Sequence, residues 1–97
     1  MMSGGDSGHS GPTRPLDFST FLLSLGTSAL VQMGDAPVPG LGEVELDMEG
    51  ARQTIDILGM LETKTRGNCT DAETSLLRNL LRDLRLRFVQ ASAAAGK

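Results

Sequence analysis

The stretch ARQTIDILGMLETKTRGNCT, residues 51–70, decides the fold because it combines a helical pattern with a sharp stop. Its apolar side chains recur at helical spacing, which predicts one buried stripe. They are Ala51, Ile55, Leu58 and Leu61. Gly67 suits the left-handed backbone that often caps a helix end. Counting back to Asp47, a good N-cap residue, we expect a helix over residues 48–66.

A further helix is predicted directly after this stretch. Thr70 and Glu73 have the spacing of a capping box, in which each side chain binds the other residue's backbone N–H. A strong apolar stripe follows, made of Leu76, Leu77, Leu80, Leu81, Leu84 and Phe88. We expect this helix to span residues 71–92, with residues 93–97 as a frayed tail.

A third helix is predicted before the opening stretch, over residues 17–33. Asp17 is its candidate N-cap, and Gly34 is its candidate left-handed end. No charged residue occurs from Phe18 to Gly34. The run is nevertheless too short and too rich in Ser and Thr to cross a bilayer. We therefore predict no transmembrane span, but a helix buried on most sides by its own domain or by a subunit partner.

The remaining segments are predicted to lack helices. Residues 35–47 contain prolines and glycines that predict a loop, although residues 43–48 alternate polar and apolar side chains and also fit a short extended segment. Residues 1–15 are rich in Gly, Ser and Pro, which predicts a disordered tail. We therefore expect an all-α chain with a single helical domain over residues 16–92.

The composition argues against several classes of function. The net charge of −3 is unlike the basic balance of a dedicated nucleic-acid binder. A single cysteine, Cys69, excludes an intramolecular disulfide, and we expect a cytoplasmic location. The only histidine, His9, lies in the predicted tail, so no nucleophile–base pair or metal-ligand cluster is indicated. We predict a protein that is not an enzyme and uses no cofactor or metal.

The first group of candidate interaction residues is apolar. Leu23 and Leu30 widen the stripe of the first predicted helix, and Ile57 and Met60 form a second apolar side on the middle helix. This is more apolar surface than one small bundle needs. We therefore predict a homo-oligomer that also binds an unidentified protein partner.

The second group is basic. Helical spacing places Arg78, Arg82 and Arg85 together, opposite the apolar stripe of the last predicted helix. They are able to contact phosphates, so RNA or DNA binding is an alternative function. A solvated face is the simpler interpretation of the same arginines. Peripheral membrane association through the uncharged first helix is a further alternative.

Three blocks of the sequence carry a family resemblance. In order, they are FSTFLLSLGTSALVQMG, ARQTIDILGMLETKTRGN and LLRNLLRDLRLRFV. With this order and spacing, the chain resembles a small bacterial family catalogued as domain of unknown function 1844, over about Phe18 to Val89. The resemblance implies a short, cytoplasmic, mainly helical bacterial protein and brings no catalytic residues. This chain departs from it at Cys69, where the family usually has an apolar residue such as Leu.

Overall fold

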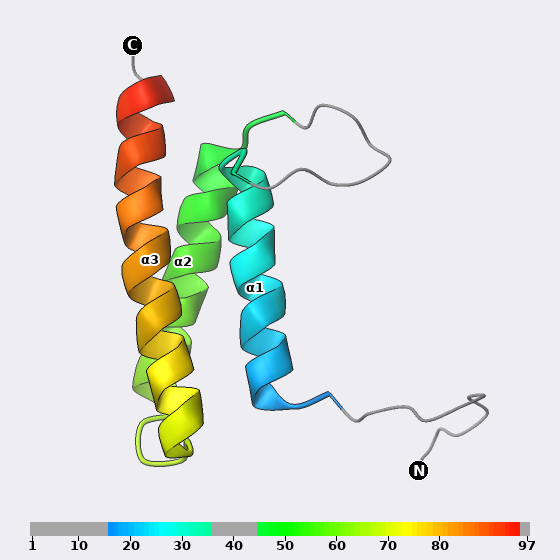
Figure 1. Cartoon of the computed structure of the whole chain (residues 1–97), viewed down its shortest axis with the longest axis vertical. Helices are drawn as coiled ribbons and strands as arrows, with labels where there is room; N and C mark the ends of the chain where they lie inside the picture. The colour runs from blue at the N-terminus through cyan, green and yellow to red at the C-terminus, as the bar shows by residue number, and fades with distance from the viewer. Residues whose placement is uncertain (1–15, 36–44, 96–97) are drawn as a thin grey trace, which may run out of the picture.

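The structure, a computed structural model, describes residues 16–35 and 45–95, and three helices lie in these ranges (Figure 1). They are α1 (Phe18–Gln32), α2 (Met48–Lys64) and α3 (Asp71–Ala95). The helices run up, down and up, and each packs against both of the others. The described residues form no strand, which confirms the predicted all-α fold.

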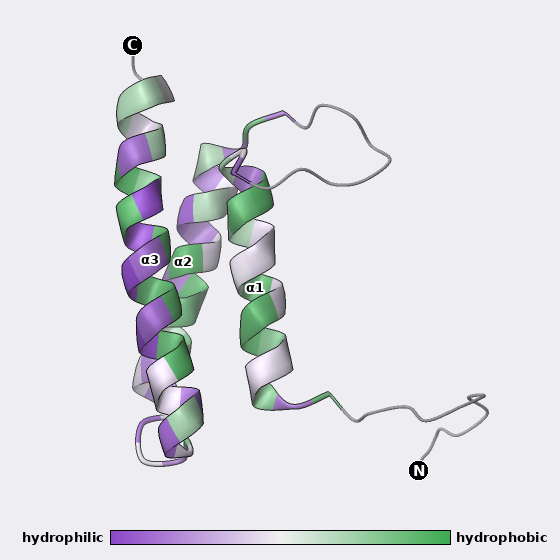
Figure 2. Cartoon of the chain, viewed as in Figure 1, coloured by the Kyte–Doolittle hydropathy of each residue, from purple (hydrophilic) through white to green (hydrophobic). Residues whose placement is uncertain are grey.

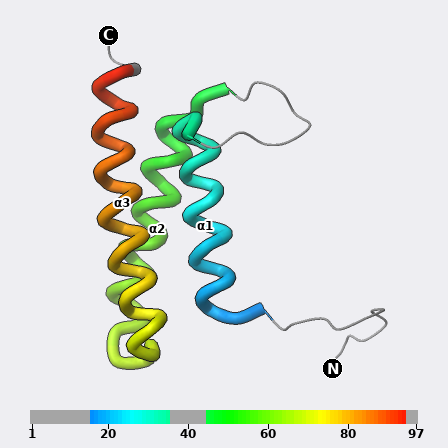
Figure 3. The backbone as a smooth tube through the Cα atoms, viewed as in Figure 1, coloured from blue at the N-terminus to red at the C-terminus, as the bar shows by residue number. Residues whose placement is uncertain are grey.

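Several sequence predictions concern residues that the structure does not describe. The tail predicted at residues 1–15 and most of the linker predicted at residues 35–47 lie outside the described ranges, as do residues 96–97. The described end of the linker, residues 45–47, is irregular rather than a strand. Figure 3 shows this segment entering α2 beside the end of α1.

The starts of α1 and α2 are capped as predicted. The backbone N–H of Thr20 donates to Asp17 Oδ1 at 2.7 Å, and that of Gly50 donates to Asp47 Oδ1 at 2.9 Å. Each aspartate therefore satisfies one of the N–H groups that the first helical turn leaves without a partner. Gly34 adopts the predicted left-handed conformation after α1, with φ of 81°.

The end of α2 differs from the prediction. The helix stops at Lys64 rather than at residue 66. The Leu61 carbonyl still accepts from the Thr65 N–H at 2.9 Å and also from the Thr65 hydroxyl at 2.7 Å, but the Arg66 N–H turns to the Thr63 carbonyl, three residues back, at 3.5 Å. The Asn68 N–H then donates to the Thr65 carbonyl at 2.8 Å. Gly67 has φ of 88°, but it shapes this turn, two residues after the cap, instead of capping the helix itself.

The capping box of α3 is confirmed in both directions. Glu73 N–H donates to Thr70 Oγ1 at 3.1 Å, and Thr70 N–H donates to Glu73 Oε1 at 2.8 Å. Helix α3 continues to Ala95, three residues beyond the end predicted at residue 92. Alanine has the highest helix propensity of all residues, so an Ala-rich end favours continuation over fraying.

The core lies along the line where the three helices meet. Its buried apolar residues are Leu22, Ala29, Met33, Ala51, Ile55, Leu58, Leu77, Leu81 and Leu84. Gly26 allows α1 to approach α3 closely, since a Cβ added there would lie 3.1 Å from Leu80 Cδ2. Figure 2 shows a difference between the helices, because α1 is almost free of strongly hydrophilic residues while α2 and α3 carry many.

Candidate functional site

The exposed side of α1 is the first candidate surface, and we call it the α1 outer face. Its residues are Thr20, Phe21, Leu23, Ser24, Thr27 and Ser28. None of them is charged, although all are exposed. Leu23 is 51% exposed and is the most exposed large apolar side chain on α1. A solvent-facing helix side without charge is unusual, because exposed helix faces normally carry Lys, Arg, Asp or Glu.

Leu30 does not belong to this surface. It is half-buried and packs against the core, whereas Leu23 points outward. Leu30, the other leucine predicted for the interaction surface, is therefore less accessible to a partner than Leu23. The two residues are seven positions apart on one helix, and only the packing of the neighbouring helices distinguishes them.

The second apolar side predicted on α2 is accessible. Ile57 is 39% exposed and Met60 is 59% exposed. Because residues three apart lie next to each other on a helix surface, the two side chains form one small apolar patch. Leu58, which lies between them in the sequence, is buried in the core. Helix α2 therefore has apolar residues on both its buried and its exposed side.

The three candidate arginines of α3 are all exposed. Arg82 donates from Nη2 to the Asn79 side chain at 3.1 Å. Within residues 16–35 and 45–95, no carboxylate lies within ion-pair distance of Arg78, Arg82 or Arg85. None of these three arginines therefore forms an ion pair with the described part of the chain.

The position of the stripe differs from the prediction. Arg78 lines a pocket together with Glu62 of α2. A Cβ added to Gly59 of α2 would lie 3.3 Å from Arg85 Nη2. These two arginines therefore follow the border with α2 rather than the side opposite the core. The sequence pattern of α3 alone does not contain this information, because it depends on where α2 packs.

Two exposed apolar residues of α3 were not among the predicted site residues. Leu86 is 57% exposed and Val89 is 64% exposed. Leu86 follows Arg82 by four positions and Val89 follows Arg85 by four, so each lies beside an arginine of the stripe. This i, i+4 spacing was the signal available in the sequence. We call Arg78, Arg82, Arg85, Leu86 and Val89 the basic–apolar face of α3.

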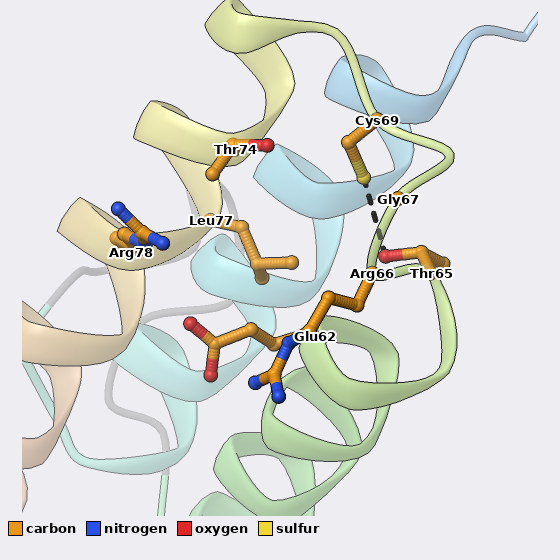
Figure 4. A pocket seen from close by; sticks show the side chains of 8 residues that line it. All are labelled: Glu62, Thr65, Arg66, Gly67, Cys69, Thr74, Leu77 and Arg78. Atoms are coloured by element: carbon orange, nitrogen blue, oxygen red, sulfur yellow. Dashed lines mark hydrogen bonds between the residues drawn. The ribbon is translucent and has the colours of Figure 1, made fainter.

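A pocket of about 290 Å³ lies at the turn between α2 and α3 (Figure 4). Its lining residues are Glu62, Thr65, Arg66, Gly67, Cys69, Thr74, Leu77 and Arg78. The half-buried Cys69 thiol donates to Thr65 Oγ1 at 3.2 Å. A neutral hydroxyl does not activate a thiol as a base would, so this pair is not a nucleophile–base arrangement.

Other charged side chains form ion pairs on the surface. Arg52 donates to Glu49 at 2.8 Å. This hydrogen bond, with the charge of the guanidinium, lowers the pKa of Glu49 and raises the pKa of Arg52. Such exposed pairs contribute little to stability.

Arg87 links two parts of the chain. It donates to Asp83 at 2.9 Å and to Asp35, beyond the end of α1, at 3.3 Å. Hydrogen bonds to both carboxylates, that of Asp83 first, raise the pKa of Arg87. Its charge is thus used inside the fold, unlike the charges of the basic–apolar face.

No group of three or more His, Cys, Asp or Glu side chains in residues 16–35 and 45–95 has the arrangement to hold a metal ion. In the same ranges, none of α1, α2 and α3 is both long enough and apolar enough to cross a membrane.

The fold and these surfaces define a small all-α protein, a bundle of three helices with uncovered apolar and basic side chains. The family model described as domain of unknown function (DUF1844) matches residues 15–90, most of the chain, and the chain belongs to this family. The family expected from the three sequence blocks is thereby confirmed. Comparisons with curated proteins and with solved structures found no match.

Proposed function

We propose that this protein is a non-enzymatic helical protein that forms homo-oligomers and acts through contacts with other proteins in the cytoplasm. The observation that carries the proposal is the α1 outer face, which is exposed along the helix and contains no charged residue. The lone free thiol of Cys69 is compatible with a reducing compartment.

The absence of charge favours a second copy of the chain as the occupant of this face. In a twofold dimer the same patch contacts itself, so residues near the axis meet their own copies. A charged residue there would meet a like charge, which is repulsive. The α1 outer face has no such residue, whereas α3 would bring its arginines together.

The apolar residues supply the driving force. Burying a fully exposed Leu stabilises an association by about 1.5–3 kcal/mol, and Leu23 is half exposed. A domain of this size gains only about 3–5 kcal/mol from its own core. Burial of Leu23 and Phe21 from two copies therefore gives a favourable term that offsets part of the cost of association. The patch of Ile57 and Met60 remains for a further protein contact.

RNA binding through Arg78, Arg82 and Arg85 is the second candidate function. It is favoured by one observation: among the described residues, no carboxylate lies at ion-pair distance from these arginines. It is opposed by the net charge of −3 and by the position of Phe88, the aromatic residue of α3, which packs against the core instead of stacking on bases. Salt-dependent RNA binding that Arg82→Glu abolishes would establish it.

Sedimentation of the full chain at micromolar concentration tests the proposal. We expect a dimer or larger oligomer. Ser24→Arg on the α1 outer face is expected to shift the protein to monomer, because it places like charges together. Ser75→Arg is the matched control, since it makes the same exposed substitution on α3. A wild-type monomer, or equal effects of the two variants, contradicts the proposal.

A further inference from the structure

The arginines of the described residues differ in how their charges are used. Arg52 is paired with Glu49, and Arg87 is paired with both Asp83 and Asp35. The arginines of the basic–apolar face have no carboxylate at ion-pair distance among the described residues. Because an unpaired positive stripe repels itself, an external group of negative charge stabilises it.

The same face also carries apolar surface. Leu86 and Val89 are both more than half exposed, and they lie beside Arg82 and Arg85. From Arg78 to Val89 the face extends about 16 Å along the helix axis. This length accommodates about three turns of a helix from another protein. The face therefore offers two kinds of contact at once, positive charge and apolar area.

We infer that the basic–apolar face of α3 binds an acidic amphipathic segment of a partner protein, with carboxylates on the arginines and apolar side chains on Leu86 and Val89. Arginine is the basic residue enriched at protein interfaces, and all four basic residues of α3 are arginines. A carboxylate matches the planar guanidinium with two parallel hydrogen bonds. The inference rests on the proposed interaction function, but it does not require self-association through α1.

A protein segment fits this face better than a nucleic acid. Exposed Leu and Val side chains gain nothing against a hydrated phosphate backbone, but they are buried by apolar side chains of a protein. A nucleic-acid duplex carries one negative charge per about 1.7 Å. Because this chain has a net charge of −3, it repels a duplex more strongly than it repels a short acidic peptide.

A peptide-binding experiment tests the inference. The probe is a labelled helical peptide of about 20 residues that presents three Glu and two Leu on one face at the spacing of the α3 residues. Its partner is the full-length chain, and fluorescence anisotropy measures binding. We expect binding that falls about tenfold or more when Gln replaces the three Glu, since the charged hydrogen bonds are lost.

Variants of the chain locate the binding face. Arg82→Glu is expected to weaken binding about tenfold or more, and Leu86→Ser to weaken it severalfold. Arg52→Glu is the matched control, because it makes the same charge change on α2, and it is expected to have less than about a twofold effect. Arg82 is exposed and its hydrogen bond to the Asn79 side chain lies within α3, so we expect its replacement to leave the fold in place, as circular dichroism will verify.

The opposing outcomes are distinct. No binding of the peptide at millimolar concentration, or equal losses for Arg82→Glu and Arg52→Glu, overturns the inference. Tighter binding of a duplex of about 20 base pairs, lost in Arg82→Glu, also overturns it in favour of nucleic acid. A third outcome is that the chain sediments as a monomer but binds the peptide as expected. This result supports the inference and contradicts only the proposed self-association through α1.

Discussion

Thr54 of α2 and Gln32 of α1 form a side-chain hydrogen bond of 2.9 Å that joins the two helices. Thr54 is 7% exposed, so its hydroxyl is shielded from water, and it also lies 2.9 Å from the Gly50 carbonyl. A buried hydroxyl needs such partners, because leaving one unsatisfied costs about 1–3 kcal/mol. The pair therefore fixes the register of α1 against α2.

Replacing the Thr54 hydroxyl tests this contact. We expect Thr54→Val to lower the free energy of unfolding by about 1 kcal/mol, because it removes the hydrogen bond and leaves Gln32 without its partner. Thr63→Val is the matched control on the same helix, since Thr63 is exposed and donates only to its own helix. Urea unfolding measures both variants, and equal losses would show that the interhelical bond adds nothing.

Two glycines of α2 are expected to respond oppositely to alanine. A Cβ on Gly50 would crowd the Asp47 carboxylate and lie 2.9 Å from Gln32 Nε2, so Gly50→Ala should destabilise by about 1 kcal/mol through the lost cap. At Gly59 the nearest atom is the flexible end of Arg85, at 3.3 Å. Gly59→Ala should therefore stabilise by about 0.5–1 kcal/mol. Thermal unfolding compares them, and shifts of the same sign would refute this account.

The capping box at the start of α3 is expected to contribute to stability. Thr70→Ala removes the side-chain acceptor for the Glu73 N–H, and we expect a loss of about 1 kcal/mol in unfolding free energy. Thr70→Ser keeps the acceptor oxygen and should retain most of the stability. If serine is no better than alanine, the side-chain bond is not the cause.

The Glu49–Arg52 pair predicts a pH dependence. Arg52 lowers the pKa of Glu49, first through its hydrogen bond and then through its charge. The contribution of the pair is therefore present above the pKa that Glu49 has in the unfolded chain, and it is lost as the pH falls through the lowered value. We expect Arg52→Ala to raise the pKa of Glu49 in an NMR titration, with little change in stability because both side chains are exposed. An unshifted pKa would speak against the pair in solution.

The helix starts could be predicted from the sequence because their chemistry is local. Asp17, Asp47 and Thr70 each cap a backbone N–H three residues ahead, so a short pattern contains the whole interaction. The end of α2 was placed two residues too late because Gly67, the left-handed glycine taken as its cap, lies three residues after the last helical residue, Lys64.

The surfaces were harder to predict because they depend on how the helices are rotated against each other. Leu23 and Leu30 are both leucines of α1, two helical turns apart, yet only Leu30 packs on the core. Arg85 was placed opposite the core but lies against Gly59 of α2. Close contacts such as that of Gly26 with Leu80 set these rotations, and no periodicity within one helix specifies them.

The charge-free outer face of α1 also has a consequence before folding is complete. Charged residues within apolar segments act as gatekeepers that slow aggregation, and residues 18–34 contain neither a charge nor a proline. We expect heating to unfold the protein with precipitation, and Ser24→Arg to make unfolding more reversible than Ser75→Arg does, as repeated calorimetric scans will show. The segment that exposes the unfolded chain to aggregation is thus the one that a second copy covers in the proposed dimer, so the proposed association also protects it.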